Sequence, residues 1–208
     1  MISVQIEPRF ESWREKARQL ISAGLKPEDV QWTDDPLQSS LFWELPVPQS
    51  LKTFYVPKTF MDLALLVACA RYGGRWDLLY RMLFRIAAGD IDLLKRVSDA
   101  DVLLANDLAK SVKKDIHKMH AFARFKAIGE GSPEEHYVAW HKPEHFTVRI
   151  GTPFFERRFG DKPWSILTPD ESAHWDGNQL KFGPGVPAHE FEHTDSLDEI
   201  WKSYYKSI

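Results

Sequence analysis

The chain has 208 residues, of which 43% are hydrophobic and 27% charged, as in ordinary globular proteins of one domain or a tightly fused pair. This composition excludes a disordered chain and a fibrous repeat. The longest apolar run, residues 63–70, is far shorter than the ~20 residues of a membrane span, and charges interrupt the first ten residues, where a secretion signal would be apolar. We therefore predict a cytoplasmic protein with no membrane partner.

The cysteine count and the net charge exclude further classes of protein. A single cysteine, Cys69, cannot form an internal disulfide, and it does not suffice for a zinc knuckle or an iron–sulfur cluster, which usually takes four thiolates. The formal net charge of −3 argues against a protein that coats nucleic acid through bulk charge, although it leaves a local basic patch open. No cofactor is predicted.

Residues 1–57 predict one helix followed by a long connection. Apolar residues from Trp13 to Ile21 recur at helical spacing, and Gly24 suits the position after a helix, so the helix should end near Ala23. Five prolines and several aromatic residues then punctuate residues 26–57. We expect an irregular arm that packs on the core, because long structureless loops are uncommon in compact domains.

Residues 58–208 are predicted to form the core of the same single compact domain. Helical spacing of apolar residues indicates two or three helices over residues 59–96 and a longer helix from about residue 99 to residue 127. Short strands follow at 137–140, 164–167, 173–175 and 180–182, with a helix at 154–159.

Turn residues between the last three predicted strands indicate an antiparallel meander. A capping box that begins at Ser196 predicts one more helix after it. The predicted fold class is therefore α+β, mostly helical with a small antiparallel β-sheet toward the C-terminus.

The long predicted helix concentrates basic charge. Residues 109–126 hold six Lys or Arg against one acid, Asp115. Polar and basic side chains recur there at steps of three and four, which places them on one stripe opposite the apolar face; they are Asn106, Lys110, Lys113, His117, His120 and Arg124. With Lys114, Arg157 and Arg158, this stripe is predicted to contact nucleic-acid phosphates, and the alternative is a solvated helix face.

Residues 189–193 read H-E-x-x-H, the pattern in which two histidines one helical turn apart hold zinc. A Gly/Pro-rich stretch precedes the match and the capping box at Ser196 follows it. We therefore place the match in a loop, where no helix holds the two ligands together, and predict no metal site.

A third cluster of polar side chains lies at the ends of the predicted strands, where a rigid sheet can hold a general base beside an anion clamp. The catalytic candidates are His117, His141, His145, His174 and Asp176. We favour a turn-shaping role for Asp176 and leave His174 open. The sequence contains no P-loop, no G-x-G-x-x-G and no G-x-S-x-G, so nucleotide hydrolysis and serine-hydrolase chemistry have no motif support.

An ordered series of segments carries a family resemblance. The segments are WREKAR at 13–18, LYR at 79–81, DIHKMHAFARF at 115–125, YVAW at 137–140 with PEH at 143–145, PFFERRF at 153–159, WSILTP at 164–169 and SAHWDG at 172–177. The series resembles the family named probable DNA metabolism protein. That family is a domain of unknown function found alone or N-terminal to a UdgX-type uracil-DNA glycosylase.

The resemblance implies a role in DNA repair, with a uracil-DNA glycosylase domain or a radical-SAM protein as partner. It supplies no catalytic residue to carry over. The cysteines that would hold a glycosylase iron–sulfur cluster are missing, which implies that the chain is not itself that glycosylase. Relatives tend to continue past the position of residue 208, so the resemblance also implies the N-terminal part of a longer protein.

We therefore expect a non-catalytic accessory domain that binds DNA or docks a partner repair enzyme. One alternative is an enzyme acting on nucleic acid or nucleotides, in which case the five catalytic candidates should meet in one pocket. Another is a protein-binding adaptor, which would expose the aromatic residues of the arm at 32–55 as a patch.

Overall fold

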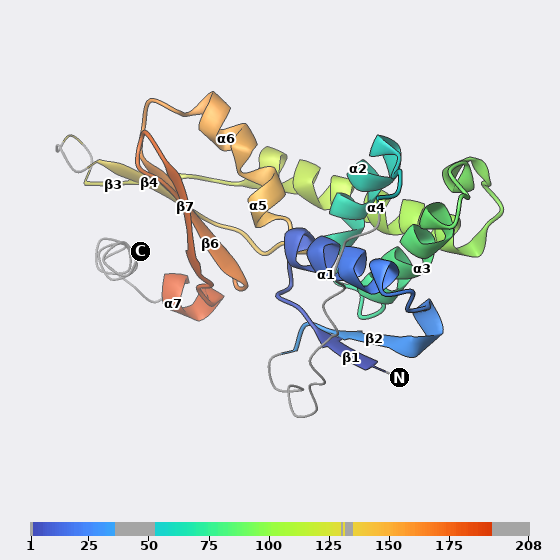
Figure 1. Cartoon of the computed structure of the whole chain (residues 1–208). Helices are drawn as coiled ribbons and strands as arrows, with labels where there is room; N and C mark the ends of the chain where they lie inside the picture. The colour runs from blue at the N-terminus through green and yellow to red at the C-terminus, as the bar shows by residue number, and fades with distance from the viewer. Residues whose placement is uncertain (1, 36–52, 130, 132–134, 193–208) are drawn as a thin grey trace. The chain divides into compact units, whose positions relative to one another are not determined.

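The computed structural model describes residues 2–35, 53–129, 131 and 135–192. The chain comprises two compact units, Met1–Val112 and Lys113–Ile208, and the boundary falls inside the long helix α4 (Ala100–Phe122) (Figure 1). The sequence analysis placed its internal division at residue 57 instead. That the two units make one domain stays a prediction, and each is described by itself.

Unit 1 begins with a strand, a helix and a second strand. β1 (Ile2–Gln5) and β2 (Val30–Thr33) pair in parallel, in register Ile2 with Val30, and α1 (Phe10–Ser22) and the 3₁₀ turn η1 (Pro27–Asp29) lie between them in sequence. The predicted helix end is confirmed, because Ala23 caps α1 and Gly24 follows with a positive φ of 77° that suits glycine. The sequence did not predict either strand, since each is only four residues long.

Helices complete unit 1. They are α2 (Lys58–Ala68), α3 (Arg75–Ala87), the 3₁₀ turn η3 (Leu93–Lys95) and the first part of α4. The prediction of two or three helices over residues 59–96 is confirmed. The long helix ends at Phe122, however, and not near residue 127, because residues from Lys126 onward pair as a strand.

The core of unit 1 is aromatic. Trp13 and Trp76 stack with ring centroids 6.5 Å apart, and Trp32 packs edge-on against Tyr80 at 5.5 Å. Trp32 is only 7% exposed, so it cannot belong to an exposed patch on the predicted arm. Tyr55 is 70% exposed, and residues 36–52 of that arm lie outside the described residues.

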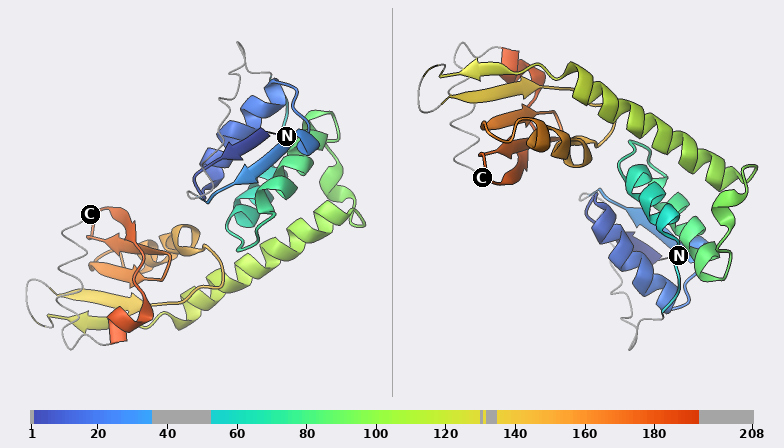
Figure 2. Two further views of the ribbon diagram at one scale, coloured as in Figure 1. Left: turned by 90° about the horizontal axis from the view of Figure 1, so that it is seen from below. Right: turned by 90° about the horizontal axis from the view of Figure 1, so that it is seen from above.

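Unit 2 is built on a five-stranded sheet in the order β3-β4-β5-β6-β7 (Figure 2). The strands are β3 (Lys126–Ile128), β4 (His136–Trp140), β5 (Trp164–Leu167), β6 (Glu171–Trp175) and β7 (Leu180–Pro184). The predicted meander is confirmed in β5, β6 and β7, which pair antiparallel. The α+β fold class is confirmed as well.

One pairing in this sheet was not expected, because β4 and β5 run parallel, with Val138 opposite Ser165. Parallel neighbours need a crossover connection. Here it contains α5 (Val148–Gly151) and α6 (Pro153–Arg158).

Alternation along the strands gives the sheet two different faces. On one face Trp164, Ile166 and Trp175 pack with Phe155 of α6 and Met119 of α4. On the other face Val138 and Leu167 pack with Val186 and with Phe191 of α7 (Ala188–Glu192). The predicted helix after Ser196 lies outside the described residues. No helix in the described ranges is both long and apolar enough to cross a membrane.

Candidate functional site

The last turns of α4 are fixed in unit 2 by a buried acid. The carboxylate of Asp115, 2% exposed, accepts hydrogen bonds from the backbone N–H of Glu144 at 3.1 Å, the backbone N–H of His145 at 3.0 Å and the hydroxyl of Thr147 at 3.0 Å. Three donors satisfy most of the acceptor capacity of one carboxylate. Asp115 therefore ties α4 to the loop that leads from β4 to α5, and it does not face solvent.

The basic stripe has the exposure that was predicted for most of its members. Lys110, Lys113, Lys114, His117 and Arg124 are all exposed along α4 and just beyond it. Lys110 belongs to unit 1, whereas the others belong to unit 2. Since the one acid of the segment is buried behind them, the outer surface of the helix is cationic. Lys118, by contrast, is paired with Glu144 at 2.6 Å.

His120, also a member of the stripe, is only partly exposed and contacts other residues of unit 2. Its Nε2 atom lies 2.9 Å from the carbonyl oxygen of Gly151, and its ring stacks on Phe154 with centroids 4.1 Å apart. A Cβ on Gly151 would approach the sulfur of Met119 to 3.0 Å, so glycine permits this close packing of α5 on α4. His120 therefore joins two helices, and its predicted role as a phosphate contact is not supported by its surroundings.

An aromatic cluster lies between Arg124, just after α4, and the arginines of α6 in unit 2. Phe125 packs edge-on against Phe155 and Phe159, with centroids 5.7 and 5.9 Å away. The guanidinium of Arg158 lies 5.6 Å from the Phe159 ring. Arg124, adjacent to Phe125 in sequence, donates to the carbonyl oxygen of Ala121 at 2.9 Å and so caps the end of α4.

The five catalytic candidates lie in different surroundings. His117 is exposed on α4, while His141 and His145 lie on the loop after β4 and His174 is buried in β6. The carboxylate of Asp176 accepts backbone N–H bonds from Asn178 at 2.9 Å and Gln179 at 2.7 Å, which lower its pKa. The turn-shaping role of Asp176 is therefore the one that its contacts support. These residues lie on α4, on the loop after β4, in β6 and in the turn after β6, and the enzyme hypothesis, which requires them to meet in one pocket, stays a prediction.

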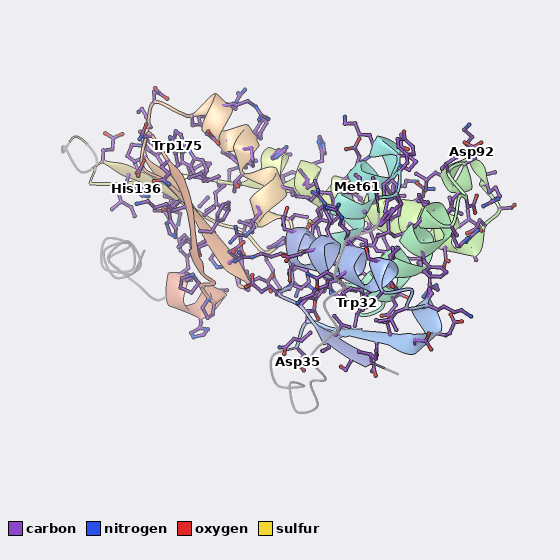
Figure 3. All side chains as sticks on the ribbon, in the orientation of Figure 1. Trp32, Asp35, Met61, Asp92, His136 and Trp175 are labelled. Atoms are coloured by element: carbon purple, nitrogen blue, oxygen red, sulfur yellow. The ribbon has the colours of Figure 1, made fainter. Side chains whose placement is uncertain are left out.

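The structure instead assembles a buried set that the sequence analysis missed. His136 of β4, labelled in Figure 3, and His174 of β6 both contact the hydroxyl of Ser165 on β5, each at 2.8 Å. The three residues are 1–3% exposed. A hydroxyl carries one proton and two acceptor lone pairs, so at least one of the two histidines donates a hydrogen bond to Ser165. This chain of hydrogen bonds crosses three strands on the sheet face that α7 covers.

Burial keeps these histidines neutral. Loss of hydration lowers the pKa of His174 to about 4, and the same cause, followed by repulsion from His174, lowers the pKa of His136 to about 4. Burial also lowers the pKa of His141, whose Nε2 atom has no hydrogen-bond partner in the described residues. Because Ser165 is 1% exposed, a substrate has no direct access to its hydroxyl. We interpret the set as a structural brace.

The H-E-x-x-H segment differs from its prediction. His189 lies on a short helix, α7, and not in a loop, because the chain turns into a helix directly after Pro187. His189 is exposed, and His193 lies outside the described residues. Among the residues that the structure describes, no group of three or more His, Cys, Asp or Glu is placed to hold a metal ion.

Cys69 follows α2 in unit 1, and its thiol lies 3.3 Å from the carbonyl oxygen of Leu65. Burial raises the pKa of this thiol to about 11, and the nearby Arg75 only partly opposes that effect. Cys69 is therefore protonated at neutral pH, and a thiol in that state is a poor nucleophile.

The chain is an α+β protein. Its long helix α4 packs its apolar face on a mixed sheet and leaves a cationic face exposed to solvent. Residues 73–208 match the model of a family described as a domain of unknown function, DUF4130. The match spans more than half of the chain, and the chain belongs to this family. It includes α3, α4 and all of unit 2. No match was found among curated proteins or among solved structures.

Proposed function

We propose that this chain is a DNA-repair accessory domain that binds DNA through the exposed basic face of unit 2. The observation that carries the proposal is the exposure of Lys113 and Lys114 on α4 and of Arg124 just after it, with Arg157 and Arg158 exposed on α6. Cations in such a row attract phosphates and release the counterions that condense on DNA.

The surroundings of these cations indicate that they are available to bind an anionic ligand, because they are not used in ion pairs with the residues that the structure describes. Within the described part of the chain, Lys113, Lys114 and Arg157 make no ion pair and no side-chain hydrogen bond. Elsewhere in the chain exposed basic residues are often paired, as Lys58 is with Asp62 and Lys95 is with Asp92. Long cationic side chains that remain solvated are available to an anionic partner.

The resemblance to probable DNA metabolism proteins supports DNA repair as the setting. By that resemblance the partner would be a uracil-DNA glycosylase domain or a radical-SAM protein. The same face would hold DNA while the partner performs the chemistry, and this chain would contribute affinity and placement.

Fluorescence anisotropy with labelled single-stranded, duplex and uracil-containing DNA tests the proposal. We expect binding at low salt that weakens steeply between about 50 and 200 mM salt. The variant Lys113→Glu/Lys114→Glu should bind more weakly, and its plot of log affinity against log salt should be less steep by about 1.8 on duplex DNA, because each lost phosphate contact removes about 0.9.

The matched control is Arg14→Glu/Arg18→Glu on α1. Both arginines are exposed in unit 1, and the double substitution changes the net charge by the same amount. The control should bind as the unchanged protein does. Absence of binding to all three DNA forms at low salt, or equal weakening by both double variants, would overturn the proposal.

A further inference from the structure

Two exposed phenylalanine side chains lie near Arg124 and Arg158 in the sequence of unit 2. Phe122, the last residue of α4, is 64% exposed, and Phe159, directly after α6, is 39% exposed. Phe125, three residues after Phe122 in sequence, packs against Phe159 with centroids 5.9 Å apart, which brings the end of α4 near the end of α6. Large apolar rings that stay in water are unfavourable unless a ligand covers them.

The cations beside these rings are held in place by the protein. The Arg124 guanidinium uses one of its nitrogens, at 2.9 and 3.4 Å, for the carbonyl oxygens of Ala121 and Ala123, which leaves donors free. This contact also offsets the negative end of the α4 dipole, which would otherwise repel a phosphate. The guanidinium of Arg158 lies over the Phe159 ring, 5.6 Å from its centroid, and Phe155 stacks on the same ring with centroids 6.4 Å apart. Phe159 therefore offers a base only the part of its ring that these neighbours leave exposed.

The part of the basic face near α6 is less cationic than its part on α4. Arg124, Arg157 and Arg158 stand against two acids that flank the α6 arginines in sequence, Glu156 and Asp161. A contact other than charge can therefore add to the affinity here, beside the phosphate contacts of Lys113 and Lys114. Every nucleobase offers an aromatic face to a phenylalanine ring, provided that the base is not stacked in a duplex.

From these features we propose that Phe122 and Phe159, with Arg124 and Arg158, form a stacking platform for unpaired bases of single-stranded DNA. The ring faces take the bases, and the guanidinium groups take the phosphates between them. This inference rests on the proposed DNA-binding function and adds the form of DNA that the site prefers.

The decisive variant is Phe122→Ala, because Phe122 is exposed and its removal leaves no cavity. Affinity for a single strand of about 12 nucleotides should fall by about 5- to 150-fold, while affinity for the matching duplex should change little. The salt slope should stay unchanged, since no charge is removed, whereas Lys113→Glu/Lys114→Glu should change the slope. Phe122→Trp should restore the affinity.

Leu103→Ala is the matched control, because Leu103 is a 50% exposed apolar side chain on the same helix in unit 1. A second measurement is photocrosslinking with a strand that contains 5-iodouracil, followed by mass spectrometry. The crosslink is expected on the peptide that contains Phe122 or Phe159.

The outcomes separate this inference from the proposed function. Duplex binding that depends on Lys113 and Lys114 but ignores Phe122→Ala would leave the function standing and overturn the platform. Tighter binding to RNA of the same sequence, or a Phe122→Ala effect on self-association by sedimentation with none on DNA, would also overturn it. No binding to any nucleic acid would overturn both proposals.

Discussion

The two units differ most in how their interiors treat ionisable groups. All eight histidines of the chain lie after residue 112, so unit 1 contains none. Unit 1 has a core of stacked aromatic rings and buries Arg75 in an ion pair with Asp34, whereas unit 2 buries His136 and His174 together with Ser165 and Asp115. The stability that comes from burying apolar side chains does not depend on pH. The stability of a fold that buries neutral histidines does, because these histidines gain a proton more readily when the protein unfolds.

The ion pair of Arg85 with Asp99 in unit 1 does not make the stability of that unit depend on pH in the mildly acidic range. Arg85 donates to Asp99 at 2.5 and 3.2 Å, and this hydrogen bonding lowers the pKa of Asp99. A carboxylate whose pKa is lowered stabilises the fold above its usual range and loses that effect only as the pH falls below about 4. Among the described residues, the buried groups whose lowered pKa favours unfolding in this pH range are histidines of unit 2. In unit 1, burial raises the pKa of Asp77, which favours the folded state as the pH falls.

The largest expected effect is therefore a selective loss of unit 2 in acid. His136 and His174 have pKa values of about 4 when folded and about 6.5 when unfolded, so the unfolded state binds more protons between these limits. Stability should be full above pH 6.5 and should fall as the pH drops toward 4, with an uptake of about two protons on unfolding near pH 5.

Hydrogen exchange read peptide by peptide between pH 7 and pH 4.5, corrected for the intrinsic exchange rate, measures this difference. Protection in β4, β5 and β6 should fall while protection in α1 and α3 stays. His189→Gln, which changes an exposed histidine, is the control and should leave the profile unchanged. Equal loss of protection in both units would contradict the comparison.

The second effect tests the aromatic core. Trp13 is fully buried, and its replacement by alanine leaves a large cavity between α1, β2 and α3. We expect Trp13→Ala to destabilise unit 1 by about 3–5 kcal/mol, with little dependence on pH. Denaturant unfolding at pH 7 and at pH 5.5 measures both quantities. A cost that grows in acid would show that the core of unit 1 is coupled to a titrating group.

The third effect tests the buried acid of unit 2. Asp115→Ala would leave the backbone N–H groups of Glu144 and His145 and the hydroxyl of Thr147 without their acceptor. We expect a loss of about 2–3 kcal/mol from unit 2, because unsatisfied buried donors are costly. Hydrogen exchange at residues 144–148 should rise first. Asp107→Ala, at an exposed acid of the same helix, is the control.

Regular patterns in the sequence predicted most of the elements. Period-3.6 apolar spacing located α1, α3 and α4, and the turns at 169–170 and 176–178 located the β5-β6-β7 meander. The exposure of Lys110, Lys113 and His117 followed from the same periodicity, because the apolar face of α4 must turn inward. Four-residue strands such as β1 and β2 carry too few alternations to stand out.

The sequence by itself therefore determined the α+β class, the cationic face of α4 and the turn around Asp176, since each depends on neighbours within a few residues. Only the tertiary structure placed His136 beside Ser165, because that contact depends on the parallel pairing of β4 with β5, which are separated by a crossover. The same holds for the contacts of His120 with Phe155 and of Phe125 with Phe159, which join residues more than 30 positions apart because α6 packs against the end of α4.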